Sequence, residues 1–223
     1  MIERKDRRLP TPQLRRIAFR AVVLAFATGL SGCSILGSGP REGGGTTIYA
    51  PDVRVAADPS WPQVDWSLAI APPTAPRMLD STRIAVRPTP GELQVYRGAS
   101  WSQPPTALVA DAVLHALEDS GKIASVARQG SGIRADYKLV LDIRRFEADY
   151  AGQTVPSAII EVNAKLLGTQ DQTVIASWTF VQKKPSSGEN VSQVVNAIEK
   201  SLSAVTRQIV HHVLKSAPNK QPN

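Results

Sequence analysis

Cysteine is nearly absent from this sequence of 223 residues, since Cys33 is the only one. A single thiol cannot form a disulfide within the chain, so the fold must be held together by packing alone. Long apolar runs are missing too. The run from Ala21 to Leu30 is about half of the ~20 residues that a membrane-spanning helix needs, and no later stretch reaches that length. The sequence therefore predicts no membrane-spanning helix.

The usual signatures of catalysis and metal binding are also missing. The sequence has no His-Glu-x-x-His, no Gly-x-Ser-x-Gly, no phosphate-binding loop and no cysteine pair. Of its three histidines, His115 is expected on one helix, and His211 and His212 near the end of another, where a histidine interacts favourably with the helix dipole. Adjacent positions diverge by about 100° around a helix, which makes a poor metal clamp. We expect no metal, no cofactor and no enzymatic activity.

One cluster of acids keeps an enzymatic alternative open. Asp136, Asp142, Glu147 and Asp149 gather around one predicted strand, together with two arginines. Charged side chains on a solvated strand face explain such a cluster without any chemistry. An enzyme that uses these carboxylates is therefore the weaker hypothesis.

What the sequence does contain begins with a targeting segment. Arg15, Arg16 and Arg20 precede the apolar run, and Leu30-Ser31-Gly32-Cys33 ends it. A basic start, a short apolar run and small residues before a cleavage point form a secretory signal. Leu, a small residue, Gly and Cys form a lipobox. We predict that residues 1–32 are removed and that Cys33 carries a diacylglycerol on its thiol and usually an acyl chain on the new amino terminus.

The formal charge of +7 is divided unevenly along the chain. Residues 1–32 hold seven basic and two acidic side chains, a net of +5, so the mature chain keeps only +2. A protein that binds nucleic acid needs a basic surface that persists in its mature form. We therefore expect no nucleic-acid partner.

The start of the mature chain predicts its location. Ser34 follows the cysteine, and the absence of Asp at this position favours the outer membrane of a two-membrane bacterium, on its periplasmic face. Residues 33–45 comprise the lipid anchor and a Gly/Ser-rich linker with a typical reach of roughly 20 Å. A folded domain is predicted over residues 46–216, followed by a polar tail at 217–223.

The domain pattern predicts short strands followed by longer alternating ones. Short strands are expected at 46–50, 67–71, 84–87, 93–95 and 123–128. Residues 137–143 alternate clearly, and a change of parity beyond them predicts a bulge near Arg145. Residues 160–166 and 174–180 alternate on either side of a turn that contains Gly168, which predicts a hairpin.

Two amphipathic helices complete the prediction. Residues 106–120 place apolar side chains on one face at helical period, and Gly121 ends the helix. Ser186 to Glu189 match a capping box. The helix behind it carries one apolar stripe, made of Val191, Val194, Val195, Ile198, Leu202, Val205, Ile209 and Val213. We predict an α+β fold in which a mainly antiparallel sheet carries both helices on one face.

Three tryptophans form a candidate contact surface for a partner. Trp61, Trp66 and Trp101 lie in proline-rich segments, which are expected to connect the regular elements. Exposed aromatic side chains on loops can anchor a partner protein. The alternative is that these indole rings close the ends of a small core.

Several short elements follow one another along the predicted domain: Tyr49, Leu68 to Pro72, Pro76 to Asp80, Ile84 to Arg87, Glu92-Leu93, and Trp101 with Pro104 before the first helix. In the order and spacing of these elements, the chain from about 46 to 215 resembles the ABC-type transport auxiliary lipoproteins. These are outer-membrane partners of lipid transport systems that contain mammalian-cell-entry (MCE) domains.

The resemblance implies a non-enzymatic component of a machine that moves phospholipid or another lipid between the inner and outer membranes. In such a system an ABC permease and ATPase lie in the inner membrane, and an MCE protein bridges the periplasm. The implied partners are the MCE protein and, through it, the permease and ATPase, while the state of self-association is left open. A structural or assembly lipoprotein of another envelope complex is the alternative.

Overall fold

The computed structural model describes residues 45–217, which belong to one compact unit, Gly45–Asn223. The elements of this part are β1 (Thr47–Tyr49), β2 (Val64–Ile70), β3 (Arg83–Arg87), β4 (Gln94–Trp101), α2 (Pro105–Ser120), β5 (Ile123–Arg128), β6 (Tyr137–Asp149), β7 (Ser157–Gly168), β8 (Val174–Pro185) and α3 (Val191–Ser216). Among the described residues there is no helix long and apolar enough to cross a membrane. The predicted signal segment, lipobox and Cys33 lie outside the described residues.

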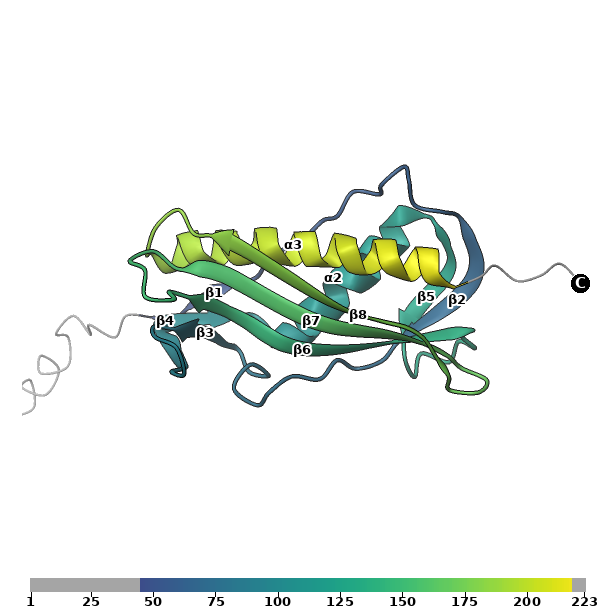
Figure 1. Ribbon diagram of the computed structural model, residues 1–223, viewed down its shortest axis with the longest axis horizontal. Coiled ribbons are helices and arrows are strands. Elements are labelled where there is room, and N and C mark those ends of the chain that lie inside the picture. Colours follow the sequence, from purple (N-terminus) through teal and green to yellow (C-terminus); the bar gives the residue numbers. More distant parts are fainter. Residues whose placement is uncertain (1–44, 218–223) are drawn as a thin grey trace, which may run out of the picture. The chain divides into compact units, whose positions relative to one another are not determined.

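The strands form one mixed sheet organised around β6 (Figure 1). One edge of β6 pairs along its length with β7, and β7 pairs with β8. Along the other edge, β2 pairs with residues 137–139 and β3 with residues 147–149, both in parallel. Between them Thr74 makes a single bridge to Asp142. β2 and β3 thus behave as one interrupted strand, with β5 beyond β2 and β4 and β1 beyond β3.

The expectation of a mainly antiparallel sheet is wrong. Of the seven strand pairs formed by the described residues, β1–β4, β2–β5, β2–β6 and β3–β6 are parallel. The period of two assigns side chains to faces, but it contains no information about strand direction. Direction depends on the connections. Because α2 links β4 to β5, the chain crosses over and enters β5 parallel to β2.

Most predicted elements are present, with some differences at their ends. The predicted bulge lies between Ile143 and Arg145, where two residues of β6 oppose one of β7. β4 is longer than expected, and its ladder with β3 is irregular around Gly98, which has a φ of 66°. The capping box predicted at 186–189 is wrong. Instead, Asn190 precedes the helix and its N–H donates to Gln193 Oε1 at 3.3 Å.

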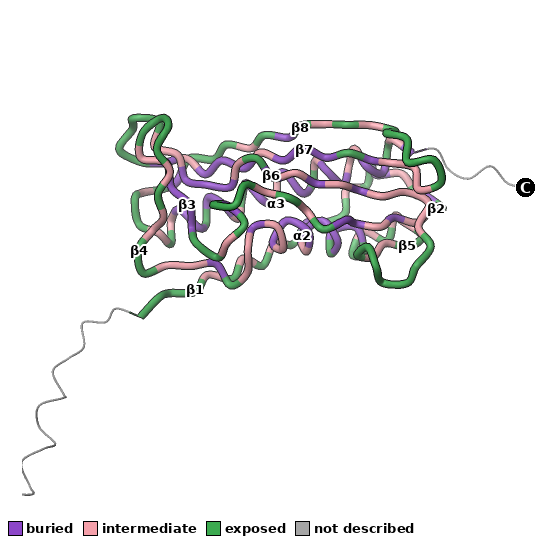
Figure 2. The backbone as a smooth tube through the Cα atoms, turned by 90° about the horizontal axis from the view of Figure 1, so that it is seen from below, coloured by how far each residue is buried: buried purple, intermediate pink, exposed green. Residues whose placement is uncertain are grey.

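Both helices cover the same face of the sheet (Figure 1). α3 packs on β7 and β8, and α2 packs against α3 and β5. The predicted apolar stripe of α3 is buried, apart from the half-buried Val191. Each such side chain stabilises the fold by about 1.5–3 kcal/mol at most. Figure 2 shows buried residues along the middle of the domain and exposed residues in the loops at both ends. The opposite face of the sheet carries no helix among the described residues.

Candidate functional site

The three tryptophans are buried, each with 2% or less of its surface exposed. Trp66 lies within β2 and Trp101 ends β4, so these two are not in connections. The ring of Trp66 meets Tyr137 edge-on at 5.1 Å, and that of Trp101 meets Phe146 at 5.8 Å. The expectation that these rings are exposed anchors for a partner is therefore corrected. Their burial agrees with the alternative that they close the core.

The acid cluster contains a buried carboxylate rather than a solvated set. Glu147 has 1% of its surface exposed. Arg87 Nε and Nη2 donate to its two oxygens at 2.9 and 3.2 Å, and Arg145 Nε and Nη2 donate to Oε1 at 2.8 and 2.6 Å. Arg145 also donates to Asp149 at 2.6 Å. The expected solvated face is wrong for Glu147, whose two arginine partners give it a structural role.

The two other acids of the cluster also have defined partners. Asp136 Oδ2 accepts from the Ser67 N–H at 2.8 Å and from its hydroxyl at 2.7 Å. Asp142 Oδ1 accepts from the Thr74 hydroxyl at 2.9 Å. Each contact ties the interrupted edge strand to β6 or to the loop before it. Within residues 45–217 no group of three His, Cys, Asp or Glu side chains is placed to hold a metal ion.

The histidines are found in packing contacts or at the surface. His212 lies 5.8 Å from Trp178 and 5.1 Å from Phe180, ring centre to ring centre, and 5.4 Å from His211. Burial, with smaller effects from nearby positive groups, lowers the pKa of His211. His115 is exposed on α2. These positions fit the expectation of ordinary helix residues.

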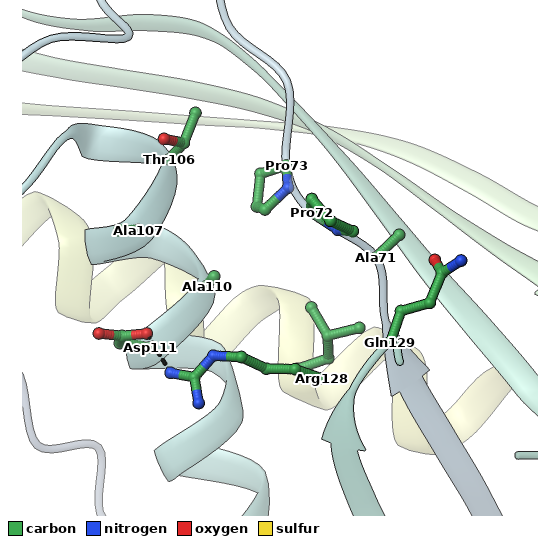
Figure 3. A pocket seen from close by; sticks show the side chains of 10 residues that line it. Ala71, Pro72, Pro73, Thr106, Ala107, Ala110, Asp111, Arg128 and Gln129 are labelled. Atoms are coloured by element: carbon green, nitrogen blue, oxygen red, sulfur yellow. Dashed lines mark hydrogen bonds and ion pairs between the residues drawn. The ribbon is translucent and has the colours of Figure 1, made fainter. Parts of the chain in front are cut away.

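An apolar pocket, here called the notch, opens where the edge of the sheet is interrupted (Figure 3). It has a volume of about 310 Å³. Its walls are Ile70 at the end of β2 with the following residues 71–73, the first turns of α2, and Arg128 with Gln129 at the end of β5. Pro72 and Pro73 have no N–H to continue the strand ladder, which explains why the edge breaks here. Small side chains on α2, Ala107 and Ala110, leave the space open.

Polar groups at the rim of the notch are bonded to one another. Arg128 Nη2 donates to Asp111 Oδ1 at 2.5 Å, and Gln103 Nε2 donates to Asp111 Oδ2 at 3.0 Å. The Thr106 hydroxyl donates to Asp80 Oδ1 at 2.7 Å. Figure 3 shows Arg128 extending to Asp111 on α2. The notch thus offers an apolar floor with a neutral, satisfied rim, which suits an apolar group and provides no activated nucleophile.

A second depression, here called the basic groove, adjoins the notch and shares Arg128 and Gln129 with it. It has a volume of about 420 Å³ and is lined by the loop from β5 to β6, by Lys138, and by the turn from β7 to β8. Arg128, Arg134 and Lys138 are among the described residues that line it, and none of these lining residues is acidic. Lys138 Nζ donates to the neutral Gln172 Oε1 at 2.7 Å.

Sequence reasoning missed this site, although its parts were visible. The run that ends at Pro72 and the helix start after Pro104 are both among the elements that carry the family resemblance. They are more than thirty residues apart, and the fold brings them together at the notch. A double proline directly after an apolar strand is the signal of an interrupted edge. The sequence did not indicate which helix would lie beneath it.

Comparison with known families identifies the class of protein. The family model described as "ABC-type transport auxiliary lipoprotein component" matches residues 47–210. That match covers more than half of the chain, so the protein belongs to this family. It is an auxiliary component of the ABC transport type rather than a member of an enzyme family, and its membership indicates a membrane-associated place in the cell envelope.

The chain is also similar to several solved structures. The chain is 56% identical to protein XCC0632 from Xanthomonas campestris, over 76% of this chain and 95% of that one, with a TM-score of 0.74. An uncharacterized protein is 11% identical and has a TM-score of 0.58, over 76% of this chain and 99% of that one. A putative lipoprotein from Caulobacter crescentus is 15% identical over 65% of this chain and 87% of its own, with a TM-score of 0.40. No curated protein matches the sequence.

Proposed function

We propose that this protein is the outer-membrane docking component of an ABC-type system in which an MCE protein carries phospholipid or another lipid between the two membranes. Membership of the auxiliary lipoprotein family, over nearly all of the described domain, is the observation that carries the proposal. The lipobox ending at Cys33 and the Gly/Ser linker support it, because they predict a domain held on a lipid tether.

The geometry of the domain separates its tethered end from its basic groove. Gly45 leads into β1, which pairs with β4, and β4 pairs with β3 beside the last residues of β6. The groove lies at the first residues of β6, beside Lys138. β6 has 13 residues and a strand rises ~3.3 Å per residue, so about 40 Å separate its ends. A tether on Cys33 joins the domain at Gly45, and we place the partner at the opposite end of β6, where the groove lies.

A tether also changes the affinity that docking requires. A membrane-bound domain meets a partner that spans the periplasm at a high effective concentration. A modest intrinsic affinity is then sufficient, and a small contact surface at the groove end is adequate for this role.

Crosslinking in living cells tests the docking role. A photoreactive residue at position 170, in the turn beside the groove, should capture an MCE-domain protein identifiable by mass spectrometry. The same residue at position 92, in the turn between β3 and β4 at the tethered end, is the matched control and should capture it less. Capture of components of a different envelope complex would support the structural or assembly alternative. If neither position nor any other exposed one captures a transport component, the docking role is contradicted.

The lipid anchor and its membrane are tested separately. Cys33→Ser should abolish palmitate labelling and outer-membrane fractionation, because the acyl chains that anchor the protein there are then absent. Ser34→Asp should keep the label and move the protein to the inner membrane. A labelled, membrane-bound Cys33→Ser protein contradicts the predicted anchor, and an unmoved Ser34→Asp protein contradicts the basis of the outer-membrane prediction.

A further inference from the structure

We propose that the notch and the basic groove together form one binding site for an anionic phospholipid, with part of an acyl chain in the notch and the phosphate of the head group in the groove. This inference rests on the proposed function and deepens it, since it makes the auxiliary protein itself a lipid carrier or receiver.

The lining and the volume of the notch suit part of an acyl chain. Its floor is formed by Ile70, Ala71, Pro72, Ala107 and Ala110, and its volume of about 310 Å³ is at the lower end of small-molecule sites. The polar rim groups Asp111 and Arg128 already pair with each other, so an entering chain leaves no buried polar group without a partner. Each methylene that the notch buries should strengthen binding about fourfold.

The cations and amides that line the groove suit a phosphate. Arg134 and Lys138 supply positive charge, and Gln129, Gln170 and Gln172 supply side-chain amides that can donate to phosphate oxygens. Carboxylates close in sequence are engaged elsewhere. Asp136 accepts two hydrogen bonds from Ser67, and Asp171 accepts two from Thr173. The groove therefore presents its cations to an incoming anion.

The residues that line both depressions favour an amphiphilic ligand. Arg128 and Gln129 line both depressions, so the apolar space and the cationic one are neighbours at the end of β5. A free phosphate or an acidic protein segment uses the groove and leaves the notch empty. A neutral lipid uses the notch and leaves Arg134 and Lys138 unpaired. A molecule with an acyl chain next to a phosphate satisfies both parts at once.

The test uses the complete mature chain with Cys33→Ser, so that no acyl chain of its own competes, and fluorescent lysophosphatidylglycerol below its micelle concentration. We expect saturable binding at least tenfold tighter than that of a monoacylglycerol with the same chain. Ala107→Trp, which fills the notch, should weaken binding of both lipids at least tenfold. Arg134→Gln with Lys138→Gln should weaken only the lysophospholipid and remove its advantage.

Matched controls separate these effects from unfolding. Ala57→Trp adds the same ring at an exposed site outside the notch, and Lys165→Gln removes one charge from an exposed site on β7 outside the groove. Both should bind like the parent chain, and every variant is checked by thermal unfolding. If the control variants lose as much binding as the site variants do, the assignment of the site is wrong.

Three further outcomes would overturn the inference. Inorganic phosphate or glycerol phosphate that competes as well as the lysophospholipid would show that the notch contributes nothing. Binding of a hexaglutamate peptide without binding of the lysophospholipid would assign the groove to an acidic protein. No saturable lipid binding by a chain that still crosslinks to an MCE protein from position 170 would overturn this inference and leave the docking role intact.

Discussion

At the end of β6 nearest Gly45, Arg87 and Arg145 close on Glu147, whereas at the other end Arg134 and Lys138 line a groove without a lining carboxylate. The difference follows from burial. A carboxylate that is 1% exposed must be paired, because an isolated buried charge is far more costly than a paired one. Surface cations need no partner, since water solvates them. One end of the sheet is therefore closed, with its charges paired inside the protein, and the other is open, with its cations at the surface.

α3 packs on β7 and β8, so the stability of the whole sheet depends on the packing of this helix. Ile198 has no exposed surface, and Leu202 has 1%. Ile198→Asp places an unpaired charge in the core and should destabilise the domain by several kcal/mol, enough to unfold a marginal domain. Urea unfolding followed by circular dichroism measures the change. Lys200→Ala, on the exposed face of the same helix, should change stability by less than ~0.5 kcal/mol. Equal losses would mean that the buried face of α3 is misassigned.

The closed end should be the more sensitive of the two to loss of an arginine. Arg145→Met removes two hydrogen bonds from Glu147 and leaves that buried carboxylate with Arg87 alone. The expected loss is about 3 kcal/mol in the free energy of unfolding, measured in urea. Adding Glu147→Met to the same chain should restore part of the loss, because the buried carboxylate that lacks its hydrogen bonds from Arg145 is then gone. A double variant as unstable as the single one would contradict the charge-pairing explanation.

The same chemical change at the open end should have little effect on stability. Arg134→Gln and Lys138→Gln each remove one positive charge from the groove. We expect each to change the free energy of unfolding by less than ~0.5 kcal/mol, because surface charges contribute little. Urea unfolding under the conditions used for Arg145→Met provides the comparison. A loss as large as that of Arg145→Met would show that the groove cations are structural, and the contrast between the two ends would fail.

Elements with a local signal could be predicted from the sequence. β6, β7, β8 and α3 have clear periods of two or 3.6 residues, and a change of parity revealed the bulge before Arg145. Trp66 also had a usable signal, since Val64, Trp66, Leu68 and Ile70 alternate within β2 and point to the core. The prolines around Trp66 favour a connection instead, and this second signal conflicts with the alternation.

Features that depend on distant segments could not be predicted in this way. The parallel pairing of β5 with β2 depends on the return of the chain through α2, and the notch needs Pro72 beside Ala107. Glu147 alternates onto the helix-free face, where a solvated carboxylate is the natural expectation. Its burial depends on Arg87, which is sixty residues earlier in the chain. Long-range pairing of this kind leaves no periodic mark in a single sequence.

The smallest expected effect concerns Asp171, the acid next to the groove, and tests whether this carboxylate neutralises the groove cations. The backbone N–H and the hydroxyl of Thr173 donate to Asp171 Oδ1 at 3.0 and 2.8 Å, and they lower the pKa of this carboxyl from its ordinary value of 3.8. Because its pKa is lower in the folded state, its stabilising effect is present above pH 3.8 and is lost as the pH falls through the lowered value. Thr173→Val should raise the pKa only part of the way to 3.8, since the backbone N–H remains. Arg134→Gln with Lys138→Gln should leave it unchanged, as measured by carboxyl NMR titration. If the groove variants raise it as much as Thr173→Val does, Asp171 neutralises the groove cations and the open end is already occupied by the protein's own charge.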